Sequence, residues 1–197
     1  HLAPYPYEPY EIRDGHLLSA EAVEASARAN RLAQLEVVLQ EMQPILAEGT
    51  PVFLTGDFNE PSHLDWTQRA AEAQLNFGMQ VDFPASTLLA THDFVDAYRS
   101  FFPDEAAYPG DTWTTRTGKD EVHDRIDYVY FKMPCAESIH LRNVKIVGES
   151  LQGADIAVSD FPSDHRAVLA TFDFPKGTQT TTLVSNVQVQ NQQTAKN

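Results

Sequence analysis

A short apolar run, Pro-Val-Phe-Leu-Thr at residues 51–55, lies between a long amphipathic segment and a polar loop. Its length and the turn residues on both sides predict a strand buried within a sheet. The amphipathic segment starts at Ser19, a favourable N-cap, and Pro44 should kink or end it. Its large apolar side chains recur at steps of three and four residues, which predicts a long helix. They are Leu32, Leu35, Leu39, Met42 and Leu46. A helix, a buried strand and a polar loop in this order predict an α/β chain.

Other segments carry weaker signals of regular structure. Residues 1–16 hold three prolines and three tyrosines within their first ten positions, which predicts a surface loop that presents aromatic rings. Ser62 and Asp65 have the spacing of a capping box, which predicts a second helix reaching about Leu75. Runs rich in β-branched and aromatic residues predict further strands. These runs are residues 112–115, 125–132 and 167–174, with one more around residues 139–147.

The chain has 197 residues, enough for one domain with its own core and too few for two. Beyond Pro175 the composition shifts to Thr, Gln, Asn and Val, so we expect residues 176–197 to be a polar tail, either disordered or an edge strand. No apolar run is long enough to span a bilayer, so we expect a soluble chain. The sequence assigns no compartment, and a secreted or periplasmic location stays open.

The formal charge of −14 leaves no basic surface for a polyanion, so nonspecific nucleic-acid binding is not expected. Carboxylates gathered around a divalent cation also make a chain acidic, however, and the cation reverses the local charge. A phosphate substrate is therefore not excluded. The single cysteine, Cys135, forms no internal disulfide, and no Cys/His spacing indicates a zinc site.

The strongest local pattern is Gly-Asp-Phe-Asn at residues 56–59, where the predicted buried strand ends. Asp57 and Asn59 alternate with Phe58, so an extended backbone places both polar side chains on one side. A carboxylate beside an amide can orient a water, or bind a cation together with an oxyanion. Asp and Asn are also common turn residues, so this pattern alone favours an ordinary turn.

Two further polar clusters adjoin predicted strands. Asp124 and Asp127 flank Arg125 within an apolar and aromatic run, and buried charges of this kind need partners. Arg125 could satisfy one of them structurally. Asp164 and His165 stand directly before the apolar run of residues 167–169, where they offer a metal ligand and a general base or phosphate-binding imidazole.

Together the three clusters resemble the C-terminal motifs of the endonuclease/exonuclease/phosphatase superfamily, which includes DNase I. The resemblance covers residues 1–174 and rests on the order Gly-Asp-Phe-Asn, an Asp-Arg-Ile or Ile-Asp-Tyr strand, and Ser-Asp-His. His1-Leu2 resembles the end of the family's Asn-x-His-Leu strand, and residues 108–115 resemble its strand with an aromatic residue and Thr. The resemblance implies an α/β (α+β) sandwich of two mixed β-sheets packed face to face with helices outside. Residues 1–175 would be the C-terminal half of that domain.

The resemblance also implies roles for particular residues. His1 and Asn59 would bind phosphate, and Asp57 would orient or deprotonate the attacking water. Asp57 and Asp164 would belong to the site of a divalent cation, Mg²⁺ or Mn²⁺. His165 would act as base or phosphate ligand, and which of Asp57 and His165 takes the proton is left open. Two more residues are assigned to substrate binding, namely Trp113 and Asp124.

A carboxylate should pair with His165 to fix its tautomer, and the sequence offers two candidates. Asp124 would be the partner in the DNase-like register, and Asp127 in the register of abasic endonucleases and sphingomyelinases. Their odd separation places them on opposite faces of a regular strand, so one of the two should reach His165. We expect Asp127.

The family's N-terminal half, with its main metal-binding Glu, has no counterpart in this sequence, and we expect it to be supplied as a partner segment. The implied activity is hydrolysis of a phosphoester by an activated water. A small or lipid-like phosphoester is favoured over nucleic acid, because the chain is acidic. The alternatives are a nuclease, a catalytically silent binding module of the same fold, and a small α/β binding domain with chance motifs.

Overall fold

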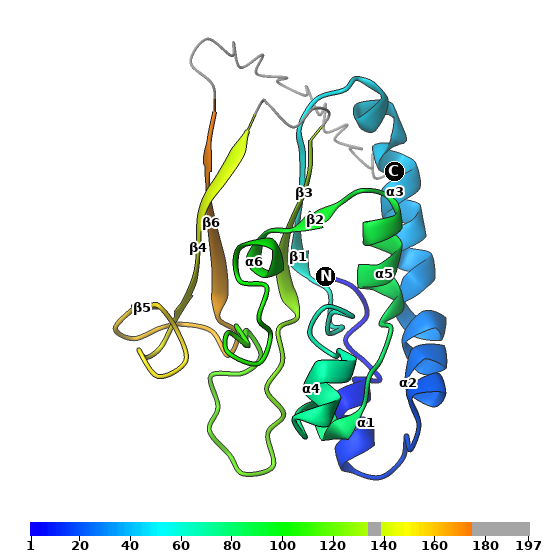
Figure 1. The fold of residues 1–197 in the computed structure, drawn as a ribbon, viewed down its shortest axis with the longest axis vertical. Helices are drawn as coiled ribbons and strands as arrows, with labels where there is room; N and C mark the ends of the chain where they lie inside the picture. Colours follow the sequence, from blue (N-terminus) through cyan, green and yellow to red (C-terminus); the bar gives the residue numbers. More distant parts are fainter. Residues whose placement is uncertain (134–138, 175–197) are drawn as a thin grey trace, which may run out of the picture.

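Two β-sheets pack against each other in the computed structural model, which describes residues 1–133 and 139–174 (Figure 1). The first sheet has the strand order β1-β3-β2 and the second the order β5-β4-β6. The strands of the first sheet are β1 (Val52–Asp57), β2 (Val95–Asp96) and β3 (Asp127–Lys132). Those of the second sheet are β4 (His140–Gly148), β5 (Ile156–Ala157) and β6 (Ala167–Asp173). Together with the helices, the two sheets confirm the predicted α+β sandwich.

The register of the first sheet brings two predicted site residues together. β3 runs antiparallel to both β1 and β2, and Asp57 lies directly opposite Asp127 at the end of the β1–β3 ladder. A backbone hydrogen bond of 2.8 Å from Phe58 N–H to the Ile126 carbonyl extends this pairing by one step. In the second sheet β4 pairs antiparallel with β6 and parallel with β5, so that sheet is mixed.

Two helices, α3 (Ala33–Ala47) and α5 (Pro84–Thr91), cover the outer side of the first sheet, and α2 (Ala20–Ala27) precedes α3 along the same side (Figure 1). The short helices α1 (Glu8–Arg13) and α4 (Gln68–Glu72) lie below the sheets in this view. The last helix, α6 (Ala97–Phe101), packs between the two sheets. Leu35 and Leu39 of α3 and Leu89 of α5 pack on Tyr128 and Tyr130 of β3 in one core. Their burial explains the helical period of the leucines, because those positions face the sheet.

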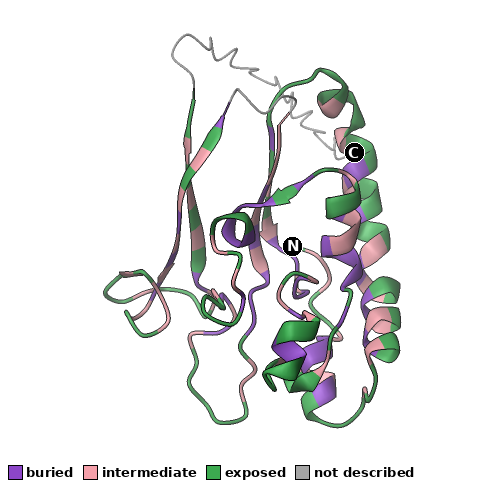
Figure 2. Ribbon diagram, viewed as in Figure 1, coloured by how far each residue is buried: buried purple, intermediate pink, exposed green. Residues whose placement is uncertain are grey.

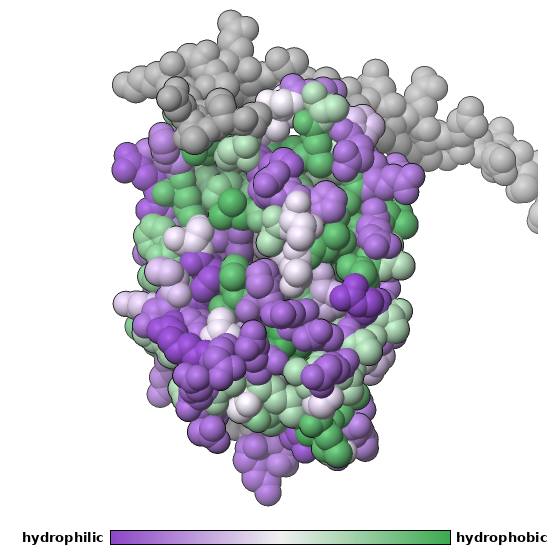
Figure 3. Space-filling model, turned by 45° about the vertical axis from the view of Figure 1, so that its right-hand side comes forward, coloured by the Kyte–Doolittle hydropathy of each residue, from purple (hydrophilic) through white to green (hydrophobic). Residues whose placement is uncertain are grey.

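A second core lies between the two sheets. Val144 and Ile146 of β4 are buried there, and Phe131 of β3 meets Phe172 of β6 with ring centroids 5.2 Å apart. β3 is therefore covered by helices on one side and by the second sheet on the other. Figure 2 shows buried residues along β3 and on the sheet-facing sides of α3 and α5. The face shown in Figure 3 mixes hydrophilic and hydrophobic side chains. Val37 of α3 is among the exposed hydrophobic residues.

The first helical region is longer and more varied than predicted. The loop expected at residues 1–16 is wrong in part, because α1 forms there with proline at its start, where no backbone N–H is required. Ser19 caps α2 as predicted by accepting a hydrogen bond from Ala22 N–H. A π-helical segment, Arg28–Leu32, joins α2 to α3, and Pro44 lies inside α3 without ending it.

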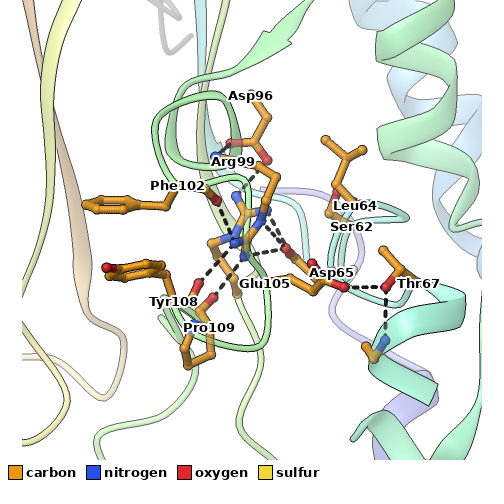
Figure 4. A network of polar contacts seen from close by, with 12 residues as sticks. Ser62, Leu64, Asp65, Thr67, Asp96, Arg99, Phe102, Glu105, Tyr108 and Pro109 are labelled. Atoms are coloured by element: carbon orange, nitrogen blue, oxygen red, sulfur yellow. Dashed lines mark hydrogen bonds and ion pairs between the residues drawn. The ribbon is translucent and has the colours of Figure 1, made fainter. Parts of the chain in front are cut away.

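Two other sequence predictions are wrong in detail. Thr67 caps α4 in place of Ser62, because its hydroxyl accepts from Ala70 N–H. Asp65 forms an ion pair with Arg99 (Figure 4) and a second one with Arg125. Residues 112–115 form isolated bridges at Trp113 and no strand.

No helix was predicted between Leu75 and Pro109, where α5 and α6 form. The predicted tail, residues 176–197, and Cys135 lie outside the described residues. Within the described part of the chain, no helix combines the length and apolar character needed to cross a membrane.

Candidate active site

The end of β1 fixes Asp57 in the site. Asp57 is 7% exposed, and one of its carboxylate oxygens accepts the backbone N–H of Asn59 at 2.7 Å. Asn59 has φ of +48°, a left-handed conformation that Asn tolerates better than most residues, so the chain turns outward directly after the strand. This local turn explains why Gly-Asp-Phe-Asn follows a strand. The predicted burial of that strand within a sheet is wrong, because β1 is outermost among the described strands of its sheet and Phe53 and Thr55 are exposed.

The first residues of the chain lie against this turn. Leu2 N–H donates to the Asp57 carbonyl at 3.1 Å, and the Asn59 side-chain amide donates to the Leu2 carbonyl at 3.0 Å. These two bonds bring the largely exposed imidazole of His1 to 3.2 Å from the other Asp57 carboxylate oxygen. His1, Asp57 and Asn59 therefore form one group.

His165 reaches the same place from the segment before β6. Its Nδ1 lies 2.9 Å from Asp127 Oδ2, and its ring packs on Trp113 with centroids 4.8 Å apart. As expected, Asp127 and not Asp124 meets the imidazole, although Asp124 lies before the start of β3 and not on its opposite face. Thr112, which belongs to no predicted site, has a buried hydroxyl that accepts the backbone N–H groups of Ile126 and Asp127, each at 3.0 Å.

The environments of two site residues shift their proton affinities. Burial raises the pKa of the Asp57 carboxyl, although the Asn59 N–H bond works in the opposite direction. The hydrogen bond that the His165 imidazole donates to the Asp127 carboxylate raises the pKa of His165, and partial burial opposes it. Asp57 is thus more basic than an ordinary aspartate, and His165 holds its charged form more readily than an ordinary histidine.

Asp57, Asp127 and His165 each offer a ligand atom, and these atoms all lie within 4.8 Å of one another. Hard divalent cations such as Mg²⁺ prefer carboxylate oxygens and usually retain several waters. Two facing carboxylates suit such a cation, and the group would supply part of its coordination. Asp164 does not belong to this group: its carboxylate is half exposed and lies 3.6 Å from the Arg116 guanidinium. It lines the same cavity nevertheless.

The structure does not bring Asp124 to the site. Its carboxylate is buried and accepts hydrogen bonds from the Tyr7 hydroxyl at 2.8 Å and the Trp66 indole N–H at 3.1 Å. Burial raises the pKa of Asp124 to about 8. The substrate-binding role expected for Asp124 has no support from this geometry, because both oxygens already have protein partners.

Arg125 also has structural partners rather than a place in the site. Its guanidinium pairs with Asp65 and Asp96, each at 2.7 Å. Arg99 joins Asp65 in the same buried network and donates to the carbonyls of two loop residues (Figure 4). The network holds α6 and the loop after it beside the segment that carries Asp124 and Asp127.

A second buried ion cluster holds the N-terminal segment in place. Arg31 is fully buried, pairs with Glu8, and lies 3.0 Å from a Glu60 carboxylate oxygen. Its remaining donors reach the carbonyls of Ala3 at 3.3 Å and Pro6 at 2.9 Å. Arg31 thus connects the segment beginning at His1 to the residue that follows Asn59. Sequence reasoning missed it because it lies far from every motif.

The residues of the candidate site surround a cavity of about 560 Å³. The predicted site residues on its wall come from the β1 end, the N-terminus, the Trp113 segment and the loop before β6. Aromatic and apolar side chains of the N-terminal segment complete the wall. The lining residues are His1, Leu2, Pro4, Tyr5, Tyr7, Tyr10, Asp57, Asn59, Trp113, Ile126, Ser163, Asp164 and His165. Asp127 stands behind His165, at 2.9 Å, and lines an adjoining hollow.

Comparison with known proteins adds two findings. A sequence profile described as the Endonuclease/Exonuclease/phosphatase family matches residues 4–165. An uncharacterized protein of Caenorhabditis elegans is 28% identical to the chain over 190 residues, which is 88% of this chain. The chain spans 58% of the length of that relative.

Proposed function

Because the chain belongs to the endonuclease/exonuclease/phosphatase family, we propose that it hydrolyses a phosphoester with a divalent cation and an activated water. The observation that carries the proposal is the convergence of His1, Asp57, Asn59 and His165 on one cavity, with Asp127 hydrogen-bonded to His165. These residues come from distant parts of the chain. Their types are the ones needed to orient water and to bind a phosphate oxygen.

In the proposed reaction the water oxygen attacks phosphorus in line with the ester oxygen that leaves. The new P–O bond forms as the ester P–O bond breaks, so no covalent enzyme intermediate is needed. Asp57, with its raised pKa and its oxygens fixed by Asn59 and His1, holds the water and is one candidate for its proton. His165 is the other candidate, or it binds a phosphate oxygen as the imidazolium that Asp127 favours.

His1 and Asn59 would contact the nonbridging phosphate oxygens, where negative charge accumulates during attack. Asp57 and Asp127 would contribute carboxylate oxygens to Mg²⁺ or Mn²⁺, and Asp164 would lie at the edge of that environment. When bound, such a cation supplies Lewis acidity and neutralises charge on the phosphate. Waters and a further segment of the domain would supply the remaining ligands, since the described residues furnish one group whose ligand atoms lie within 4.8 Å of one another.

Two alternatives remain distinct from this proposal. A nuclease would use the same residues on a phosphodiester of DNA or RNA, and the family supports hydrolysis of either substrate type. A catalytically silent module would keep the fold and lose the chemistry. Every catalytic residue that the resemblance assigns to this half of the domain is present, which favours an enzyme over a silent module.

The test is hydrolysis of p-nitrophenyl phosphate and bis-p-nitrophenyl phosphate by the complete protein. We expect activity to disappear with EDTA and to return when Mg²⁺ or Mn²⁺ is added in excess. Asp57→Ala should not recover with metal, whereas Asp120→Ala, an exposed acid away from the cavity, should behave as the unchanged protein. Full activity in EDTA would refute metal dependence, and no hydrolysis under any condition would favour the silent module.

A further inference from the structure

One side of the cavity is built from aromatic side chains that the proposed chemistry does not use. Tyr5 projects from the N-terminal segment and is 78% exposed, although it lines the cavity. Trp113 and Tyr10 also line it, together with Pro4. A large aromatic side chain exposed at the rim of a concave site is a recurring feature of ligand pockets.

The aromatic side is held in place before any ligand binds. Trp113 donates its indole N–H to the Tyr10 hydroxyl at 3.0 Å, and that hydroxyl donates to a Glu121 carboxylate oxygen at 2.7 Å. Tyr7 meets the Tyr10 ring edge-on with centroids 5.3 Å apart. The indole N–H therefore has its partner within the protein, and the Trp113 ring, which packs on His165 with centroids 4.8 Å apart, also lines the cavity.

The cationic side chains that line the cavity lie at one end of it. Among the described residues that line it, the cationic or potentially cationic groups are His1 and His165, at the end where Asp57 lies. No Lys or Arg is among those lining residues, and Asp164 adds negative charge at the rim. One phosphate fits the histidine end. Along the aromatic side Arg13 lies 4.4 Å from the Tyr10 ring centroid, but its guanidinium is paired with Asp14 and does not line the cavity, so a second phosphate would be held there less well.

From this arrangement we infer that the side formed by Pro4, Tyr5, Tyr10 and Trp113 is a subsite for a flat, uncharged ring of a small phosphoester. The inference rests on the proposed function, because the phosphate end of the same cavity orients the ligand. Flat rings stack on or pack edge-on against aromatic side chains, which gains affinity beyond the area that they bury. The cavity volume of about 560 Å³ accommodates a phosphate and a ring.

The experiment compares phosphonates that the protein cannot hydrolyse and that carry the same charge. Phenylphosphonate, methylphosphonate and octylphosphonate are each used as inhibitors of p-nitrophenyl phosphate hydrolysis by the complete protein with Mg²⁺. We expect phenylphosphonate to bind about tenfold more tightly than methylphosphonate, in keeping with a ring packed on aromatic walls. Octylphosphonate should bind less tightly than phenylphosphonate.

Substitutions test whether the aromatic side causes the preference for phenylphosphonate over methylphosphonate. Tyr5→Ala should reduce the phenyl-to-methyl ratio several-fold, and Tyr10→Phe should reduce it less, because the ring remains and the hydrogen bond to Trp113 is lost. Tyr108→Ala, an exposed tyrosine outside the cavity, should keep the wild-type ratio.

An equal affinity for the phenyl and methyl compounds would overturn the subsite while leaving the proposed hydrolysis intact. Tighter binding of octylphosphonate would also overturn it, in favour of a chain-binding groove. Metal-dependent hydrolysis of p-nitrophenyl phosphate is measured in the same experiment, so its absence would refute the proposed function separately.

Discussion

The imidazole of His165 lies 2.9 Å from the carboxylate of Asp127, although 38 residues separate them in the sequence. Asp127 opens β3, and His165 precedes β6, so the contact depends on the packing of the two sheets. Asp124, three residues before Asp127, faces the interior and bonds to Tyr7 and Trp66. The two acids therefore have different partners.

This difference predicts different effects of two matched substitutions. Asp127→Asn should lower the turnover number by roughly a hundredfold, because the imidazole loses the partner that fixes its tautomer and favours its charge. Asp124→Asn should change turnover far less, because Asp124 does not reach the cavity. Steady-state kinetics of both variants checks this. The opposite order would show that the DNase-like register operates.

The residues proposed to act on water and phosphate should each be needed for turnover. Asp57→Ala, Asn59→Ala and His165→Ala should each lower the turnover number by roughly a hundredfold or more, with the fold retained by circular dichroism. His16→Ala, an exposed histidine of the N-terminal region, is the control and should have no effect. Near-normal turnover in all three variants would favour the silent binding module.

The buried Arg31 should stabilise the fold through its partners. Arg31→Ala would leave Glu8 and Glu60 buried without a cation, so we expect the free energy of unfolding to fall by about 3–5 kcal/mol. Arg28→Ala, an exposed arginine of the same helical region, should change it by less than about 0.5 kcal/mol. Urea denaturation measures both, and equal effects would contradict the role given to Arg31.

The pKa of Asp124, raised by burial to about 8, predicts how stability depends on pH. In the unfolded chain this carboxyl ionises near pH 4, whereas in the folded protein it ionises near pH 8. The folded state holds the proton more tightly, so the contribution of Asp124 to stability falls as pH rises from about 4 to about 8.

Asp124→Asn should remove this dependence. Relative to the variant, the unchanged protein should lose on the order of a few kcal/mol between pH 5 and pH 8.5, at about 1.4 kcal/mol for each pKa unit. Urea denaturation at the two pH values gives the difference. Parallel pH profiles for the two proteins would show that Asp124 is ionised at both pH values.

Local patterns predicted much of this fold, and contacts between distant residues account for what was missed. The spacing of the leucines predicted α3, and the apolar run at residues 51–55 predicted β1. Both predictions depend only on residues that are close together in the sequence. α1 was missed because three prolines favoured a loop, although proline is tolerated at a helix start.

In the candidate site too, local motifs were predictive and contacts between distant residues were not. The Gly-Asp-Phe-Asn and Ser-Asp-His motifs led to Asp57, Asn59 and His165, which share the cavity. The burial of Asp124 could not be predicted, since its partner Tyr7 is 117 residues away. Trp113 was predicted in a strand, and it forms bridges to two separate segments instead. Such contacts leave no periodic trace in a sequence.

We propose that a further segment of the same domain packs against residues 1–197, as the family resemblance implies. β1 and β6 are outermost in their sheets, so within the described residues one backbone edge of each has no neighbouring strand. Unpaired edges promote association with other chains. The chain also spans 58% of its Caenorhabditis elegans relative. Residues 1–197 expressed alone should therefore aggregate and lack metal-dependent phosphatase activity.

A substitution in the complete protein tests the same proposal without isolating a fragment. Leu169 of β6 is 47% exposed, on the face opposite Val168 and Ala170, which pack between the sheets. If another segment covers it, Leu169→Lys should lower the free energy of unfolding of the complete protein by about 1–3 kcal/mol, because a buried ammonium would lack a partner. Val37→Lys, on the exposed side of α3, should change it by less than about 0.5 kcal/mol. Equal, small effects in urea denaturation, together with a monodisperse and active residue 1–197 chain in size-exclusion chromatography, would show that these residues form a phosphoesterase complete in itself.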